Sequence, residues 1–256
     1  MNRSKMKLRV IVPALLGVVL LCGAAGQRRV SVFMIGDSTM ADKPNPATNP
    51  ERGWGQMLPS FLDSAVMVRN FAVNGRSTRS FIDEGRWDAV AREIRPGDYV
   101  MIQFGHNDQK SEDPARYTNP YTAYRRNLER FVAETRERGG VPVLFSSIVR
   151  RKFNASGVLE DTHGAYPFVA RAVAREMEVP FIDLQMMTEE MVMGAGVEGS
   201  KRWYVWVAPG TNAMYPEGRQ DDTHLSAAGA TEVARMAADG LQRSGLPIAR
   251  SVRGVR

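Results

Sequence analysis

Apolar residues in this chain occur in short runs that alternate with stretches of helical spacing. Five apolar runs have the length and composition of strands: residues 30–35, 65–71, 99–104, 141–148 and 180–184. Helical spacing occupies residues 55–62, 87–94, 121–138, 166–177 and 227–244. This alternation is typical of βαβ units around a parallel sheet. Since no repeat or linker interrupts it, we predict one α/β domain over residues 27–244, followed by a basic, frayed tail over residues 245–256.

The first 26 residues differ in composition from the rest of the chain. Four basic and no acidic residues lie there, an apolar run spans residues 10–21, and small residues end the segment. Secretory signal peptides have this order, and the run is too short to favour a stable membrane span. We therefore expect cleavage near Ala25 or Gly26 and export, either to the periplasm or to the extracellular medium. The alternative is a lipoprotein anchored through Cys22, but bulky Leu21 stands where lipoprotein signals usually have a small residue.

Charge and cysteine content narrow the classes of function. The formal net charge is +6, and loss of the four basic residues of the first 26 lowers it to +2. The sequence lacks the basic clusters with interleaved aromatic residues that indicate nucleic-acid binding. The single cysteine, Cys22, lies in the expected signal peptide. The mature chain therefore has no thiol nucleophile, disulfide or thiolate metal site.

The first predicted strand ends in Gly36-Asp37-Ser38-Thr39. Residues 30–35 are apolar on both faces of that strand, as in a buried parallel sheet. Open α/β sheets bind ligands just beyond the carboxyl ends of their strands, so Ser38 is a candidate nucleophile. The alternative is that this tetrapeptide only forms a turn. Met40 stands where the nucleophile elbow of the α/β-hydrolases has a glycine, so this serine does not lie in that motif.

Two later strands also end in polar residues. After residues 65–71 comes Asn74-Gly75-Arg76-Ser77, where Gly75 can bring its backbone N–H close to a bound oxygen because it has no Cβ. The alternative is an ordinary Asn-Gly turn. After residues 99–104 comes Gly105-His106-Asn107-Asp108. The Asn107 side chain is a neutral donor suited to an oxyanion, whereas a histidine beside a glycine at a strand end is more often structural.

A fourth polar block, Asp221-Asp222-Thr223-His224, precedes the last predicted helix. Three residues of separation on one turn would place the Asp221 carboxylate at the Nδ1–H of His224. That contact would leave Nε2 free to accept a serine proton. We expect Asp222 to cap or solvate the helix start. The alternative is that the block only caps the helix. Because the chain has three histidines, a serine nucleophile has few possible bases.

These four blocks resemble, in order and spacing, those of the SGNH or GDSL hydrolases. Within that superfamily, Thr39 and the Gly105-His106-Asn107-Asp108 run resemble the rhamnogalacturonan acetylesterase branch. The resemblance covers nearly all of the mature chain. It implies a flavodoxin-like three-layer α/β/α sandwich with a five-stranded parallel sheet, and it implies no metal or organic cofactor.

The resemblance also assigns roles to residues of this chain. It implies that Ser38 is the nucleophile, His224 the base and Asp221 its partner. It implies an oxyanion hole made of the Ser38 N–H, the Gly75 N–H and the Asn107 side chain. The function implied is a secreted serine esterase that removes acetyl groups from plant cell-wall polysaccharide, with pectic rhamnogalacturonan as the favoured substrate. Acetylxylan esterase and general acetylesterase are the alternatives.

Candidate contacts to a polysaccharide are two cations and three indoles: Arg76, Arg79, Trp54, Trp203 and Trp206. Arginines near the presumed oxyanion glycine suit uronate carboxylates. Residues 194–220 lack clear periodicity and are expected to form a long loop beside the catalytic histidine, whose aromatic residues suit sugar rings. For each residue the alternative is an ordinary surface cation or a packing residue.

Two functions of other classes compete with the esterase. Metal-dependent phosphoesterases are one, because Asp37, His106, Asp108, Asp221 and His224 are potential metal ligands. Such enzymes have an early Asp-x-His and an Asn-His pair, and this sequence has neither. The other is a non-catalytic carbohydrate-binding domain with the same fold. The sequence carries no signal for an oligomeric state.

Overall fold

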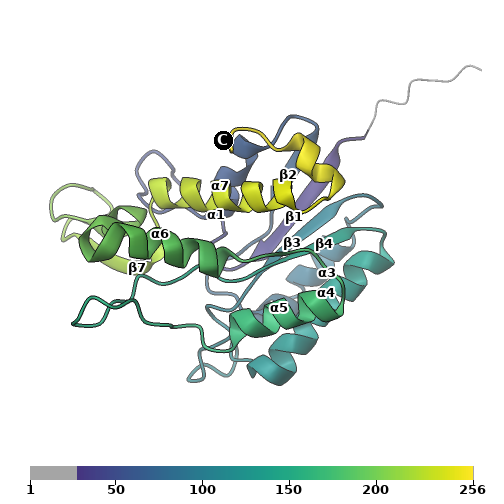
Figure 1. The fold of residues 1–256 in the computed structure, drawn as a ribbon, viewed down its shortest axis with the longest axis horizontal. Helices are drawn as coiled ribbons and strands as arrows, with labels where there is room; N and C mark the ends of the chain where they lie inside the picture. Colours follow the sequence, from purple (N-terminus) through teal and green to yellow (C-terminus); the bar gives the residue numbers. More distant parts are fainter. Residues whose placement is uncertain (1–27, 256) are drawn as a thin grey trace, which may run out of the picture.

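The computed structural model describes residues 28–255 (Figure 1). The predicted signal peptide, residues 1–26, lies outside the described residues together with Cys22. The described part folds around a five-stranded sheet with the order β2-β1-β3-β4-β5. The strands are β1 (Val30–Gly36), β2 (Val66–Asn70), β3 (Tyr99–Gln103), β4 (Val141–Phe145) and β5 (Phe181–Ile182). No helix in residues 28–255 is long and apolar enough to span a membrane.

The predicted α/β class and its parallel sheet are confirmed. Every pair of neighbouring strands in the sheet is parallel. Side chains of β1 alternate between two buried layers, because successive residues of a strand point to opposite faces. Val32 and Met34 belong to one apolar core cluster, and Phe33 and Ile35 belong to the other. A strand covered on both faces explains why residues 32–35 form a continuous apolar run.

Helices cover both faces of the sheet and complete a three-layer sandwich. One layer contains α1 (Trp54–Met57), α6 (Leu184–Gly199) and α7 (Ala227–Arg243), with the 3-10 turns η1 (Leu58–Phe61), η3 (Ser200–Trp203) and η4 (Pro247–Ser251). The other contains α2 (Thr78–Asp83), α3 (Arg86–Ala91), α4 (Arg125–Glu137) and α5 (Tyr166–Glu176), with the π turn η2 (Pro120–Tyr124). Figure 1 shows α6 and α7 on one side of the strands and α3, α4 and α5 on the other.

The last helix begins where the fourth polar block ends. The Ser226 side chain caps α7 by accepting a hydrogen bond from the N–H of Gly229 at 3.1 Å. A Cβ on Gly229 would lie 1.9 Å from the Trp203 carbonyl oxygen, so only glycine lets the helix approach η3 this closely. Val233 and Leu241 are fully buried against the sheet. The start of α7 is therefore held firmly beside the preceding strand.

The expected loop over residues 194–220 is wrong in part. Residues 194–199 form the last part of α6. The rest of the segment includes an antiparallel pair of strands, β6 (Tyr204–Val207) and β7 (Arg219–Leu225). Within α6 only Leu184, Thr188 and Val192 are buried, so the helix shows little apolar periodicity in the sequence. Only its first residue, Leu184, overlaps the predicted strand 180–184, of which two residues pair as β5.

The prediction of a frayed tail is also wrong. Residues 247–251 form η4, and Ile248 and Val252 are buried in the core. Val252 forms a bridge with Leu62, and the N–H of Arg253 donates to the Phe61 carbonyl at 2.8 Å. Two apolar side chains without periodic neighbours are too weak a signal to identify such a segment, although they are enough to anchor it.

Candidate active site

Ser38, His224 and Asp221 lie in one hydrogen-bonded row. Ser38 follows β1, and its Oγ lies 2.9 Å from Nε2 of His224. The Nδ1 of the same ring lies 2.9 Å from Oδ2 of Asp221. Ser38 is 8% exposed, so the hydroxyl is largely shielded but not sealed off from solvent. A nucleophile, a base and a carboxylate that orients the base require this geometry.

The backbone of β7 brings Asp221 back to His224. Tyr204 pairs with Leu225, yet the next residue, Val205, pairs with Asp221. Residues 222–224 therefore bulge out of the ladder, as extra residues in one strand do. Oδ1 of Asp221 accepts the N–H groups of Thr223 and His224, both at 2.9 Å. The contact predicted between Asp221 and His224 is present, but the predicted single helical turn is wrong.

The Asp221 carboxylate is ionised by its surroundings. Partial burial favours the neutral acid, but hydrogen bonds from the His224 ring, from Arg219 and from the His224 N–H lower the pKa of this carboxyl well below its usual range. Arg219 donates at 2.7 Å to the same oxygen that faces His224 Nδ1. The carboxylate thus remains an acceptor at neutral pH and fixes the tautomer whose Nε2 faces Ser38.

Asp222 does not cap the final helix, so that expectation is wrong. Its Oδ1 accepts hydrogen bonds from Arg151 at 2.7 Å and from the Trp206 indole at 2.9 Å. Ser226 is the cap instead. Because Asp222 lies in the bulge, its side chain points away from the Asp221–His224 contact and ties β7 to the segment that follows β4.

The loops after β2 and β3 are held together by hydrogen bonds. Gly75 has a φ of +75°, a conformation that side chains other than glycine rarely adopt. The Asn107 amide donates to the Arg76 carbonyl at 3.1 Å, which leaves its second N–H available. Asn107 is 4% exposed. The two loops predicted to supply oxyanion donors are therefore adjacent and rigidly connected.

Asp108 strengthens this connection at the start of α2. Its Oδ1 accepts hydrogen bonds from Oγ1 of Thr78 at 2.5 Å and from Oγ1 of Thr118 at 2.7 Å, and the Thr78 N–H also donates to it. Burial raises the pKa of Asp108 to about 7, although these hydrogen bonds favour the carboxylate. The side chain is fully enclosed, so its role is to hold the loops rather than to meet a substrate.

Lys43 is a buried residue of the site that the sequence analysis did not identify. Its Nζ donates to the Ser38 carbonyl at 2.7 Å and to Oδ1 of Asn74 at 2.6 Å, and it pairs with Oε1 of Glu51 at 2.8 Å. All three ammonium protons are therefore used. Glu51 forms a bridge with Ser226 at the end of β7. One lysine thus connects the serine, the Gly75 loop and the histidine segment, and a lone lysine in a sequence carries no signal of this.

A cluster of buried titratable groups lies behind Ser38. Oδ1 of Asp37 accepts hydrogen bonds from the N–H and Oγ1 of Thr39, and Oδ2 lies 3.3 Å from Nδ1 of His106. Burial favours the neutral acid, but the His106 ring and the Thr39 donors lower the pKa of Asp37. Burial lowers the pKa of His106 and lowers that of His163 more strongly. Both rings are therefore neutral at pH 7, and they meet edge to face with their centroids 4.6 Å apart.

The candidate substrate contacts have different surroundings. Trp54 is fully buried, donates to Gln103 and packs on Phe145; it belongs to the core, and the prediction that it contacts sugars is wrong. Two cations lie over the Trp206 ring: Cζ of Arg151 is 4.8 Å and Nζ of Lys201 is 4.5 Å from the ring centroid.

The other three candidates are partly exposed. Trp203 packs on the core beneath Arg202, whose guanidinium lies 4.3 Å from its ring centre. Arg76 pairs with Glu84, and Arg79 donates to the carbonyls of residues 114 and 117. Nothing else in the structure assigns these three a ligand, and their contacts to a polysaccharide stay predictions.

The potential metal ligands named from the sequence do not lie in one cluster. Within residues 28–255, no three His, Cys, Asp or Glu side chains converge as a metal site would require. The five potential ligands named from the sequence are instead divided. Asp221 and His224 lie in the row with Ser38, and Asp37, His106 and Asp108 lie in the buried layer behind it.

Comparisons with known proteins relate the chain to a family of esterases. A sequence model of the GDSL-like lipase/acylhydrolase family matches residues 34–231. The chain is 44% identical to rhamnogalacturonan acetylesterase RhgT of Bacillus subtilis (strain 168) over 222 residues, which cover 87% of this chain and 94% of that protein. It is 29% identical to a rhamnogalacturonan acetylesterase of Emericella nidulans, over 86% of this chain and 87% of that protein.

Solved structures show the same fold. Protein YXIM of Bacillus subtilis superposes with a TM-score of 0.69 at 26% identity, over 86% of this chain and 58% of that longer chain. Axe2, an acetylxylan esterase of Geobacillus stearothermophilus, superposes with a TM-score of 0.60 at 18% identity, over 86% of this chain and 95% of that one.

Proposed function

Because the chain belongs to the GDSL-like lipase/acylhydrolase family, we propose that it is a carbohydrate acetylesterase that releases acetate from pectic rhamnogalacturonan by a serine acyl-enzyme mechanism. It is a carboxylic ester hydrolase, as is its 44% identical relative. The observation that carries the mechanism is the row of two 2.9 Å contacts that joins Ser38 to His224 and His224 to Asp221.

The acylation step follows from this row. As Oγ of Ser38 attacks the acetyl carbonyl carbon, Nε2 of His224 accepts the hydroxyl proton, because a neutral serine is a weak nucleophile. The Asp221 carboxylate stabilises the imidazolium that forms. The negative charge on the carbonyl oxygen is met by the Ser38 and Gly75 N–H groups and by the Asn107 amide. The carbon–oxygen bond to the sugar then breaks, and His224 returns the proton to the sugar oxygen.

Deacylation repeats the same steps with water. His224 removes a proton from the attacking water, the tetrahedral intermediate occupies the same oxyanion donors, and collapse releases acetate and restores the Ser38 hydroxyl. The buried ammonium of Lys43 holds the Ser38 carbonyl and the Asn74 side chain throughout. A rigid arrangement of donors supports catalysis because no reorganisation is needed when charge develops.

Two relatives support the choice of substrate, and the N-terminal sequence pattern supports export. Both proteins named as rhamnogalacturonan acetylesterases match over more than four fifths of this chain. Rhamnogalacturonan is a polymer outside the cell membrane, so the signal-like residues 1–26 fit an enzyme that is exported to meet it.

Acetate release from three substrates tests the proposal. The purified protein is given acetylated rhamnogalacturonan, acetylated xylan and a small aryl acetate, each with the wild type and with Ser38→Ala. We expect fastest turnover per site on rhamnogalacturonan and loss of activity on all three substrates in Ser38→Ala. Equal rates on the three substrates would reduce the claim to a general acetylesterase.

Metal dependence is tested in the same assay. We expect a chelator to leave acetate release unchanged, because the proposed steps use only side chains and backbone N–H groups of the chain. Loss of activity with chelator and its recovery on addition of a divalent metal ion would refute the serine mechanism.

A further inference from the structure

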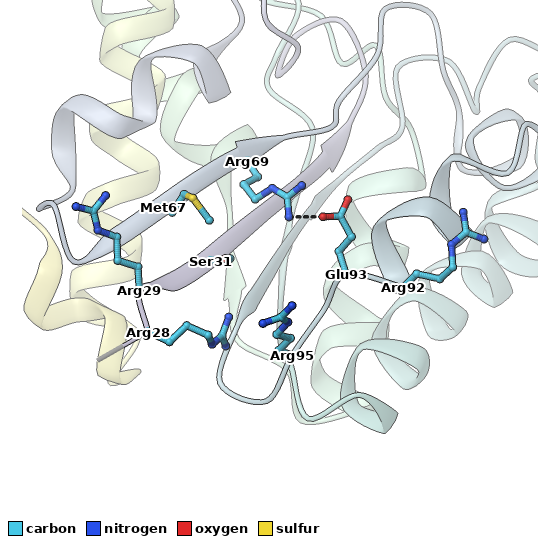
Figure 2. A pocket seen from close by; sticks show the side chains of 8 residues that line it. All are labelled: Arg28, Arg29, Ser31, Met67, Arg69, Arg92, Glu93 and Arg95. Carbon is cyan, nitrogen blue, oxygen red and sulfur yellow. Dashed lines mark ion pairs between the residues drawn. The ribbon is translucent and has the colours of Figure 1, made fainter. Parts of the chain in front are cut away.

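An arginine-rich pocket lies at the end of the sheet opposite to Ser38. Its cavity is about 440 Å³, within the range of small-ligand pockets. The lining residues are Arg28, Arg29, Ser31, Met67, Arg69, Arg92, Glu93 and Arg95 (Figure 2). Ser31 lies near the start of β1 and Ser38 follows its carboxyl end, and the stretch of β1 from Ser31 to Gly36 alone spans roughly 16 Å. The pocket, which we call the arginine pocket, is therefore separate from the catalytic row.

The arginine pocket forms because helices leave this part of the sheet uncovered. Met67 lies beside Ser31 on the edge strand β2, and Arg69 lies beside Phe33. Met67 is 44% exposed, although it lies on a sheet face that elsewhere packs against helices. Residues 92–95, just after α3, and residues 28–29, just before β1, supply the walls. Figure 2 shows the lining arginines around this open stretch of β1 and β2.

The arginine pocket carries an excess of positive charge. It has five arginines and one glutamate. Two arginines are neutralised: Arg69 pairs with Glu93 at 2.6 Å, and Arg28 pairs with the buried Asp98 at 2.9 Å. Arg29, Arg92 and Arg95 are exposed and form no ion pair with any residue of the described range 28–255. Three guanidinium groups without an ion pair therefore line the pocket together with an apolar methionine, a combination that suits an anion with apolar faces.

We propose that the arginine pocket is a non-catalytic binding site for the uronate units of an acidic polysaccharide. A guanidinium group binds a carboxylate with two parallel hydrogen bonds. The Met67 side chain and the arginine stems offer apolar surface to the C–H face of a sugar ring. This inference rests on the proposed function, since a pectic substrate carries uronates. A polymer held here and at Ser38 binds more tightly than at either site alone.

Direct binding tests the arginine pocket without any need for catalysis. Binding of polygalacturonate without acetyl groups is measured by affinity electrophoresis and by calorimetry for the wild type and for the triple variant Arg29→Gln, Arg92→Gln and Arg95→Gln. We expect the triple variant to bind about tenfold more weakly, because exposed ion pairs contribute modestly each. Binding of a neutral galactan should be absent in both proteins.

A control variant loses three arginines outside the arginine pocket, so its net charge equals that of the pocket variant. Arg126, Arg136 and Arg175 are exposed on α4 and α5, and the triple change of these residues to Gln should leave polygalacturonate binding within twofold of the wild type. Equal losses in the two triple variants would overturn the proposal, because they would indicate a general charge effect. Equally strong binding of a single-stranded oligonucleotide, lost in the same variant, would also overturn it by pointing to a polyanion site without preference for sugars.

Kinetics separate this proposal from the proposed function. In the arginine-pocket variant, KM for acetylated rhamnogalacturonan should rise about tenfold, while kcat on that polymer and kcat/KM on a small aryl acetate stay at the wild-type value. An unchanged KM for the polymer would contradict the proposal. If the wild type releases no acetate from any substrate, the proposed function fails, and the binding measurement still decides whether the arginine pocket holds uronates.

Discussion

Replacement of Lys43 by methionine tests whether one buried cation holds the catalytic segments together. The Lys43 side chain is 2% exposed and contacts the Ser38 carbonyl, Asn74 and Glu51 at 2.6–2.8 Å. Methionine has a similar length and fills the same apolar space, but it lacks the ammonium group. Lys43→Met therefore removes two hydrogen bonds and one ion pair without opening a large cavity.

The size of the effect follows from what the substitution leaves behind. Removing one partner of a buried ion pair costs about 3–5 kcal/mol of unfolding free energy. Glu51 is 18% exposed, so water partly hydrates its carboxylate once the ammonium group is gone. We therefore expect a loss at the lower end of this range, about 3 kcal/mol of unfolding free energy. For a domain of this size that loss corresponds to a fall in Tm of roughly 6–12 °C. Because Ser38 and the Gly75 loop lose a shared anchor, kcat on an aryl acetate should fall about 10- to 100-fold.

The assay combines thermal unfolding with steady-state kinetics on the same preparations. Lys152→Met is the matched control, since Lys152 is exposed and its side chain makes no hydrogen bond within residues 28–255; its Tm should change by less than about 2 °C. The double variant Lys43→Met with Glu51→Gln should regain part of the lost stability, because it no longer leaves a carboxylate without its partner. A Lys43→Met protein with wild-type Tm and kcat would refute the reasoning.

Three further predictions concern the row at Ser38 and the histidines behind it. Asn107→Ala should lower kcat by about 10²- to 10³-fold with the fold intact, and a variant with full turnover would remove Asn107 from the mechanism. Asp221→Asn should lower kcat by about 10³- to 10⁴-fold, because the amide no longer fixes the His224 tautomer; a loss below tenfold would contradict that role. His163→Gln tests pH dependence: burial lowers the pKa of His163 in the folded state, so wild-type stability is lost as pH falls below the unfolded value near 6.5. Between its unfolded and folded pKa values, a buried histidine lowers the free energy of unfolding by about 1.4 kcal/mol for each unit that the pH falls. Asp108 has a raised pKa, so it stabilises the fold as pH falls, but it does so equally in the wild type and in the variant. The stability advantage of the wild type over His163→Gln should therefore shrink between pH 6.5 and 5 in urea titrations, and parallel curves would contradict the buried neutral ring.

The central strands of the sheet, β1, β3 and β4, could be predicted from the sequence because they are buried on both faces. Residues 32–35 are apolar on both faces of β1, a pattern that is typical of a strand covered on both sides. The segment 184–225 could not be predicted in the same way. Only three side chains of α6 are buried, and β7 has polar residues at most positions because it contains the block Asp221-Asp222-Thr223-His224. Where polar side chains occupy a strand, the apolar pattern no longer reports the local structure.

The site shows a similar division. Residue types and their order predicted that Ser38, Asp221 and His224 act together, and the structure brings the three side chains into one hydrogen-bonded row. The bulge in β7 that joins Asp221 to His224 depends on the register with β6, and register is a tertiary property. The sequence does not indicate the role of Lys43, because its three partners, Ser38, Glu51 and Asn74, meet around the ammonium group only in the folded chain. Trp54 was misassigned because a tryptophan between two glycines has the same sequence pattern in a core as in a cleft.

Identification of the residue labelled by a fluorophosphonate tests the central claim most directly. The reagent reacts with a serine only when a base activates its hydroxyl, so peptide mass spectrometry of the labelled protein locates the nucleophile. We predict one phosphonyl group on Ser38, loss of acetate release in proportion to labelling, and no labelling in His224→Ala. Labelling of another residue, or full activity in a protein whose Ser38 is completely labelled, would contradict the account.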